Sequence, residues 1–187
     1  AAPASPTTAR LPAKLRVLVA DDDATNCLVM KKTLSRIAKA SAASWKLETT
    51  NIAEHAVASF EAALGTESPF DLVIVDEQFD ARSAMSGSEA VRRMRGLQAG
   101  WRTVVADGDP PATAGDGAAS KDCVAHGGSA GRAAFILWTG HHTDDDVGGS
   151  SVTRVADGPD DVWGKPPPSW LTGAMQSRLQ RILVASG

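Results

Sequence analysis

The sequence has no tyrosine, and its phenylalanine and tryptophan residues make up only 5% of the 187 residues. Proteins that bind single-stranded nucleic acid by stacking bases on aromatic rings need more such side chains, so this class is excluded. Basic residues are not in excess either, because the formal net charge is −3 at pH 7. A mildly acidic chain does not bind nucleic acid through bulk charge, and we therefore expect no direct nucleic-acid partner.

Cysteines and long apolar runs are also scarce. Cys27 and Cys123 are the two cysteines, too few for a disulfide scaffold or a zinc-ligand cluster. The longest apolar runs, such as residues 72–75 and 135–138, are far shorter than the ~20 residues of a membrane-spanning helix. We therefore expect no membrane segment in this chain. Its length fits one domain with some residues left for tails or insertions.

Two stretches lack a sustained apolar periodicity. Residues 1–14 are rich in alanine, proline and threonine and carry no acidic residue, which is typical of a linker. Residues 98–132 are rich in glycine, alanine, aspartate and proline, which is typical of a flexible surface insertion. We expect residues 15–187 to form a single domain, with the insertion between a helix and the fourth strand.

In that domain, short apolar runs alternate with segments of helical periodicity. We expect strands at residues 15–20, 45–49, 70–75, 134–138 and 162–163, and helices at residues 25–40, 53–64, 88–95 and 170–185. In the first helix, the helical spacing of Leu28, Val29, Leu34 and Ile37 predicts that these residues form its apolar face. Strands that alternate with helices in this way predict an α/β fold with a parallel sheet.

Polar residues follow the ends of these strands. Asp21 and Asp22 follow the first strand and Asp76 the third, while Thr139 follows the fourth and Lys165 the weak last strand. The chemistry of α/β folds lies beyond the carboxyl ends of the strands, so we expect these groups to meet. An acidic run at the end of a single strand is more often part of a solvated loop. Here, however, chemically suited polar residues follow four different strands, and such an arrangement is unlikely to arise by chance.

The chemistry of these side chains fits phosphoryl transfer. Clustered carboxylates repel one another unless a cation neutralises them, and carboxylate oxygens are typical ligands of Mg²⁺. A carboxylate beside such an ion can attack a phosphoryl group and form an aspartyl phosphate. The Lys165 ammonium and the Thr139 hydroxyl are suited to bind the oxygens of that group.

The same motifs resemble the receiver domain of two-component response regulators. Residues 15–23 resemble the first strand of that family with its acidic pair, and Asn26 matches an asparagine common at the start of the next helix. Residues 71–76 resemble the strand that carries the phosphoacceptor, and Met85, Gly87 and Glu89 match the later part of the pattern D-x-x-M-P-x-M-D-G-x-E. Residues 139–141, Thr-Gly-His, and the run to Lys165-Pro166 resemble the last two motifs.

The resemblance implies a doubly wound, five-stranded parallel sheet flanked by helices, the flavodoxin-like receiver fold. It implies that Asp76 is phosphorylated by its own domain's catalysis, that Thr139 and Lys165 contact the phosphoryl group, and that Mg²⁺ is the cofactor. The implied metal ligands are Asp21, Asp22, Asp76 and the backbone carbonyl of Gln78. The implied partner is a histidine kinase or a histidine phosphotransfer protein in the cytoplasm.

The sequence also departs from the family pattern. Three more residues than usual separate Asp76 from Gly87, and Phe79-Asp80 replaces the Met-Pro pair. Val162 stands where the family usually has an aromatic switch residue. Residues 143–155, where the fourth helix of the family lies, contain Gly148-Gly149, which are poor helix formers. The loop after Asp76 and the signalling face are therefore the least typical parts.

Several alternatives remain open from the sequence. Residues 21–25, Asp-Asp-Asp-Ala-Thr, also fit the D-x-D-x-T motif of haloacid-dehalogenase-like phosphatases, with Asp21 as the nucleophile. A pseudo-receiver that binds partners without phosphorylation is a further alternative. The linker-like start favours the C-terminal receiver of a hybrid histidine kinase over a stand-alone receiver. A homodimer is open as well.

Overall fold

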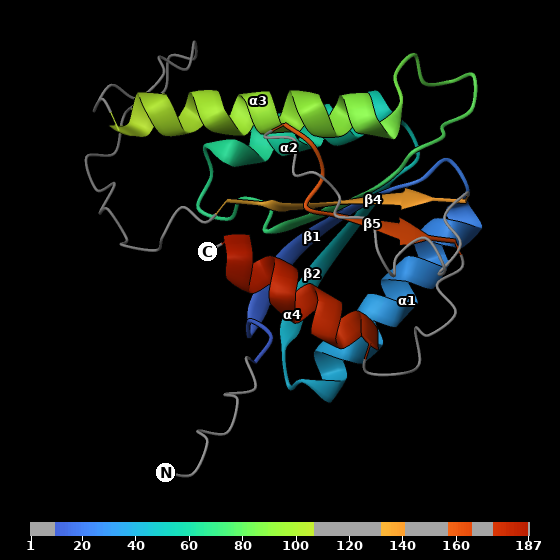
Figure 1. Ribbon diagram of the computed structural model, residues 1–187, viewed down its shortest axis with the longest axis vertical. Coiled ribbons are helices and arrows are strands. Elements are labelled where there is room, and N and C mark those ends of the chain that lie inside the picture. The colour runs from blue at the N-terminus through green and yellow to red at the C-terminus, as the bar shows by residue number, and fades with distance from the viewer. Residues whose placement is uncertain (1–9, 107–131, 141–156, 166–173, 187) are drawn as a thin grey trace, which may run out of the picture.

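The computed structural model describes residues 10–106, 132–140, 157–165 and 174–186. These residues form a five-stranded, wholly parallel sheet in the order β2-β1-β3-β4-β5 (Figure 1). The strands are β1 Lys14–Ala20, β2 Ser44–Thr50, β3 Leu72–Asp76, β4 Ala134–Thr139 and β5 Asp161–Gly164. The predicted flavodoxin-like α/β fold is therefore confirmed.

Helices cover both faces of the sheet. The described helices are α1 Ala24–Ala40, α2 Ala53–Leu64, α3 Gly87–Ala106 and α4 Ala174–Ser186. Figure 1 shows α2 and α3 on one face and α1 and α4 on the other. None of the helices within the described residues is long and apolar enough to cross a membrane.

Two apolar cores follow from this double coverage. Alternate residues of β1 point to opposite faces, so Val17 and Val19 join the core under α1 and α4, whereas Leu18 joins the core under α2 and α3. The central strands β3 and β4 are buried along their whole length. This burial explains why the sequences of β3 and β4 are continuous apolar runs and do not alternate between apolar and polar residues.

The apolar face predicted for α1 is partly wrong. Leu28 and Val29 are 49% and 45% exposed. The buried residues of the helix are Cys27, Met30, Leu34 and Ala38. These positions form a stripe along one side of the helix, and the side chains of Cys27 and Met30 fill the space next to the sheet where leucine and valine were expected.

The boundary predicted for the insertion is also wrong. Helix α3 continues to Ala106, so residues 98–106 are helical, and Gln98 is buried. Gly96 and Gly100 hide this continuation in the sequence, because glycine is a poor helix former. The rest of the predicted insertion up to residue 131 lies outside the described residues, as do residues 141–156 and 166–173 of the predicted fourth-helix region and tail helix.

The predicted linker is shorter than expected at its inner end. Lys14 begins β1, and Leu11 is buried in the core beneath α1 and α4. The indole N–H of Trp45 donates a hydrogen bond to the carbonyl of Pro12 at 3.1 Å. Residues 10–14 therefore pack with the domain, whereas residues 1–9 lie outside the described part of the chain.

Candidate functional site

Three carboxylates meet at the carboxyl ends of β1 and β3. These two strands are neighbours in the sheet, Asp21 and Asp22 follow β1 directly, and Asp76 is the last residue of β3. One carboxylate oxygen from each of the three lies within 4.8 Å of the others. Asp21 is wholly buried and Asp76 is 5% exposed, whereas Asp22 is partly exposed. The structure thus brings together the three aspartates that the sequence predicts to meet at the ends of the strands.

Lys165 inserts its ammonium among these carboxylates. Its Nζ lies 2.7 Å from a carboxylate oxygen of Asp21 and 2.7 Å from one of Asp76. The backbone N–H of Lys165 donates to the carbonyl of Thr139 at 2.9 Å, which ties the residue to the end of β4. Burial by itself would lower the pKa of Lys165, but its two carboxylate partners outweigh that effect and raise the pKa, so the ammonium stays charged.

The environment of Asp76 disfavours its charge. Burial raises the pKa of Asp76, the neighbouring Asp21 raises it further, and Lys165 only partly offsets the two. Three carboxylates held by a single ammonium in the described site leave an excess of negative charge. A divalent cation would compensate this excess, and the oxygen donors match the preference of Mg²⁺, so these residues fit the implied metal.

Thr139 and Gln78 belong to the same edge of the sheet. Thr139 is the buried last residue of β4, one position beyond Trp138, which pairs with Asp76 in the strand register. Gln78 follows Asp76 by two residues and is exposed. The roles predicted for the Thr139 hydroxyl and the Gln78 carbonyl stay predictions.

The turn from β1 into α1 holds Asp21 in place. One of its carboxylate oxygens accepts hydrogen bonds from the backbone N–H of Asp23 at 2.9 Å and from the side chain of Asn26 at 3.2 Å. Asp23 itself caps α1 by accepting from the N–H of Thr25 at 2.7 Å, a bond that lowers the pKa of Asp23. The third acid of the Asp21–Asp23 run therefore starts a helix, while Asp21 and Asp22 face the site.

The thiol of Cys27 packs beneath this turn. Burial raises the pKa of Cys27 to about 11, and the sulfur lies 3.4 Å from the backbone oxygen of Asp21. A thiol that stays protonated at neutral pH is a poor nucleophile, so Cys27 is a packing residue of the core.

The unusual loop after Asp76 is anchored on both sides. Next to the acidic cluster, the backbone N–H of Asp80 donates to the carboxylate of Asp22 at 3.1 Å, and Arg82 pairs with Asp80 at 2.8 Å. At the start of α2, the Ser83 hydroxyl accepts from the N–H of Ala53 at 3.0 Å. Sequence reasoning missed these contacts, because nothing in the order of residues links the loop to α2.

Glu54 completes the second anchor. Its carboxylate accepts from the N–H of Ala84 at 2.7 Å, so that α2 and the loop exchange hydrogen bonds in both directions. Together these bonds hold the longer loop beside Asp22 in a defined conformation. The loop with its three extra residues is therefore tied by hydrogen bonds both to the acidic cluster and to α2.

Gly87 lies against the backbone of Asp76. A Cβ added at this position would lie 1.9 Å from the carbonyl oxygen of Asp76 and 2.8 Å from its carbonyl carbon. The N–H of Gly87 donates to the carbonyl of Glu77 at 3.0 Å, and the Ser86 hydroxyl caps α3 by accepting from the N–H of Glu89 at 3.2 Å. The start of α3 thus packs directly on the end of β3, which requires glycine.

Gly87→Ala is expected to destabilise the domain by about 3 kcal/mol, because backbone atoms cannot rotate out of the way as a side chain can. Chemical denaturation measures the change. Gly96→Ala is a matched control on the same helix, because its Cβ would meet no atom within 4 Å. A Gly87→Ala protein as stable as the control would contradict the close approach.

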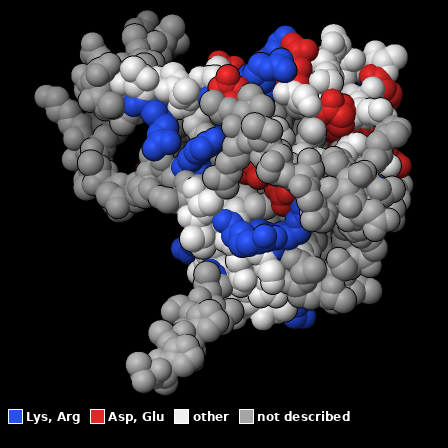
Figure 2. All heavy atoms as spheres, viewed as in Figure 1, with Lys and Arg blue, Asp and Glu red and all other residues white. Residues whose placement is uncertain are grey.

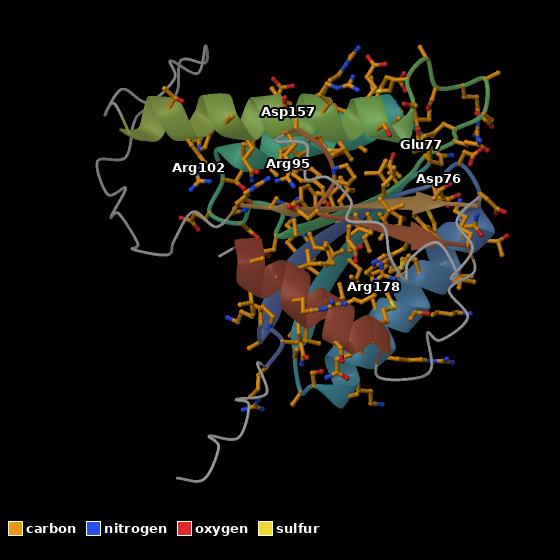
Figure 3. All side chains as sticks on the ribbon, viewed as in Figure 1. Asp76, Glu77, Arg95, Arg102, Asp157 and Arg178 are labelled. Atoms are coloured by element: carbon orange, nitrogen blue, oxygen red, sulfur yellow. The ribbon has the colours of Figure 1, made fainter. Side chains whose placement is uncertain are left out.

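Figure 3 shows how the site lies relative to the rest of α3. Asp76 and Glu77 lie at the end of the sheet where α3 begins, and Arg95 and Arg102 lie further along the helix. Arg95 is buried there, pairs with Asp160 and donates to the carbonyl of Ala133 at 3.3 Å. This second charged cluster connects α3 to the starts of β4 and β5 and is separate from the carboxylates.

Comparisons with known proteins agree with this fold. No family model matches the sequence, and no curated protein matches it. A response regulator receiver domain protein from Clostridium thermocellum is 16% identical over 91% of this chain and 94% of that chain, with a TM-score of 0.54. The chemotaxis protein CheY4 from Vibrio cholerae is 18% identical over 91% and 99% of the two chains, with a TM-score of 0.52.

A third solved structure, the signal receiver domain of an HD domain-containing protein from Pseudomonas fluorescens Pf-5, gives the same result. It is 13% identical over 96% of each chain, with a TM-score of 0.52. The structural neighbours of this chain are therefore receiver domains of the response-regulator type. At such low identity they show the fold, and function has to be argued from the carboxylates and Lys165.

Proposed function

We propose that this domain accepts a phosphoryl group on Asp76. The observation that carries the proposal is the placement of Lys165, whose ammonium contacts both Asp21 and Asp76 within a cluster of three carboxylates. The donor would be a phosphohistidine of a histidine kinase or a histidine phosphotransfer protein. A carboxylate oxygen of Asp76 attacks phosphorus, the P–N bond to the imidazole breaks, and an acyl phosphate forms.

The other residues of the cluster would support this step. Bound Mg²⁺ supplies positive charge for the oxygens of the transferred group. Asp21, Asp22, Asp76 and the Gln78 carbonyl would hold it. Lys165 is the charged donor for one phosphoryl oxygen, and the Thr139 hydroxyl is the donor for another. Because Lys165 pairs with Asp76 before the reaction, it is already near the oxygen that will carry the phosphoryl group.

The phosphatase alternative is less well supported. Both carboxylate oxygens of Asp21 are engaged, one by Asp23 and Asn26 and the other by Lys165, and the residue has no exposed surface. An atom that attacks a phosphoryl group must be reached by it, which favours Asp76. The pseudo-receiver alternative would be expected to lack part of this set, whereas all the side chains are present.

The wider setting of the domain is part of the same proposal. We propose that the domain is a cytoplasmic receiver of a hybrid histidine kinase, with a stand-alone receiver as the second candidate. We propose no nucleic-acid partner. On the face shown in Figure 2, the described basic residues lie in several separate places and form no continuous basic surface.

Intact mass spectrometry tests the proposal. Incubation with acetyl phosphate or phosphoramidate and Mg²⁺ is expected to add a single phosphoryl mass, and peptide mapping should place it on Asp76. Chelation of the metal before incubation should prevent the reaction. A protein that gains no mass supports the pseudo-receiver alternative, and a protein modified on Asp21 supports the phosphatase alternative.

Mg²⁺ is expected to change the fluorescence of Trp138. The Nζ of Lys165 lies 4.7 Å from the centre of the Trp138 ring, and a metal that shares Asp21 and Asp76 with Lys165 alters this contact. A titration should also raise the melting temperature, since the metal binds the folded state. The fluorescence change should disappear in Trp138→Phe and persist in Trp45→Phe. A titration without any effect would contradict the metal site.

A further inference from the structure

An apolar groove with a volume of about 700 Å³ runs between α2 and α3. Its apolar walls are Val57 and Leu64 from α2 and Leu97 and Trp101 from α3. The side chains that face the sheet from these helices, such as Phe60, are different ones and are fully buried. The α2–α3 groove therefore lies on the outer side of the helix pair, where Val57 and Leu64 pack partly against the core and are partly exposed in the groove.

Two glycines of α3 line the α2–α3 groove. Gly96 and Gly100 are exposed and lie four residues apart, so they share one side of the helix. A Cβ at either position would meet no heavy atom within 4 Å in the described part of the chain. Glycine weakens a helix interior, and no packing within the described domain requires it here. A close approach by another backbone is a physical reason for glycine at such positions.

Opposite charges border the groove on its two sides. Glu61 stands on α2, where it has no ion pair or hydrogen bond from its side chain among the described residues. Arg93 stands on α3, and it pairs with Glu89 of the same helix at 2.6 Å on the surface. A pair of this kind between exposed side chains is weak and can be exchanged.

This arrangement is self-complementary. The helices α2 and α3 lie side by side and run in the same direction, because Gly65 at the end of α2 lies beside Trp101 late in α3. A twofold axis along the groove places α2 of one copy over α3 of the other. Glu61 of each copy then borders the same side of the interface as Arg93 of its partner, so opposite charges meet on both sides of the interface.

We propose that the α2–α3 groove is the interface of a homodimer of this chain. The apolar residues of both copies would be buried at the centre, Gly96 and Gly100 would allow the helices to approach, and the two Glu61–Arg93 pairs would set the register. The acidic cluster lies at the beginning of α3 and stays outside this interface (Figure 3). The proposal is therefore independent of phosphorylation.

Analytical ultracentrifugation of the full 187-residue chain tests the dimer. We expect the sedimentation coefficient to rise with concentration between the low micromolar and the submillimolar range. Gly96→Gln and Gly100→Gln should raise the dissociation constant by tenfold or more without lowering the melting temperature of the monomer. Ala62→Gln, at an exposed position of α2 outside the groove, is the matched control and should leave the dissociation constant unchanged.

Charge exchange tests the orientation of the two copies. Glu61→Arg and Arg93→Glu should each be monomeric, because each places like charges opposite one another. An equimolar mixture of the two variants should form a heterodimer, and the double variant should again form a homodimer. The proposal is overturned if the unmodified chain stays monomeric throughout, if the glutamine variants dimerise as the control does, or if the mixture stays monomeric.

Discussion

Asp76→Asn is expected to abolish the gain of phosphoryl mass completely. The asparagine keeps the shape of the side chain at the end of β3 but offers no carboxylate oxygen for attack on phosphorus. The fold should survive. Burial raises the pKa of Asp76, so its charged form is disfavoured in the metal-free domain, and a neutral amide avoids that penalty.

The stability of this variant should depend on pH in a defined direction. A carboxyl group whose folded pKa is raised stabilises the fold by binding a proton at acidic pH, and this contribution is lost as the pH rises through the folded pKa. The variant should therefore gain stability relative to the unmodified metal-free protein between acidic and neutral pH. Urea unfolding at a series of pH values measures the difference.

Asp71→Asn is the matched control for the labelling experiment. Asp71 precedes the other end of β3 and accepts a hydrogen bond from the N–H of Arg16 at 2.7 Å, so its removal should not affect labelling. If Asp76→Asn still gains the mass while Asp71→Asn does too, Asp76 is not the acceptor. Mapping of the modified peptide would then identify the nucleophile.

The convergence of the site could be predicted because parallel strands end at one edge of a sheet. The apolar runs before Asp21 and Asp76 identified two strands, and their neighbouring positions in the sheet bring the carboxylates together. The same reasoning placed Lys165 at this edge. The sequence could not show that its ammonium would lie between Asp21 and Asp76, because that contact depends on the direction of a long side chain.

The two wrong predictions, of where α3 ends and of which face of α1 is buried, have local causes. Gly96 and Gly100 interrupt the helical pattern of α3, so the helix was expected to end before Gln98, although the continuing stripe through Met94 and Gln98 is buried. In α1, the helical spacing of the large apolar residues placed Leu28 and Val29 on the buried face, but both are exposed. Helix phase decides burial, and here it favours the smaller or more flexible side chains at other positions.

Lys165→Met is expected to destabilise the metal-free domain by about 3–5 kcal/mol at neutral pH, because it removes the cation from a buried ion-paired group. Asp21 is wholly buried and Asp76 nearly so, and the lysine is 18% exposed at its side chain. Without Lys165, the carboxylates face one another in a poorly solvated site. Urea unfolding in the presence of a chelator measures the loss, and phosphoryl labelling should fall as well, since a donor to the phosphoryl oxygens is missing.

Two further measurements separate this explanation from a simple loss of packing. Mg²⁺ should stabilise Lys165→Met more than the unmodified protein, because the metal then supplies the only compensating charge in the described site. Adding Asp76→Asn to Lys165→Met should recover much of the lost stability, since it removes one of the uncompensated charges. If neither Mg²⁺ nor the second substitution restores stability, charge compensation of the carboxylates is not the role of Lys165, and its ammonium acts through another contact such as that with the Trp138 ring.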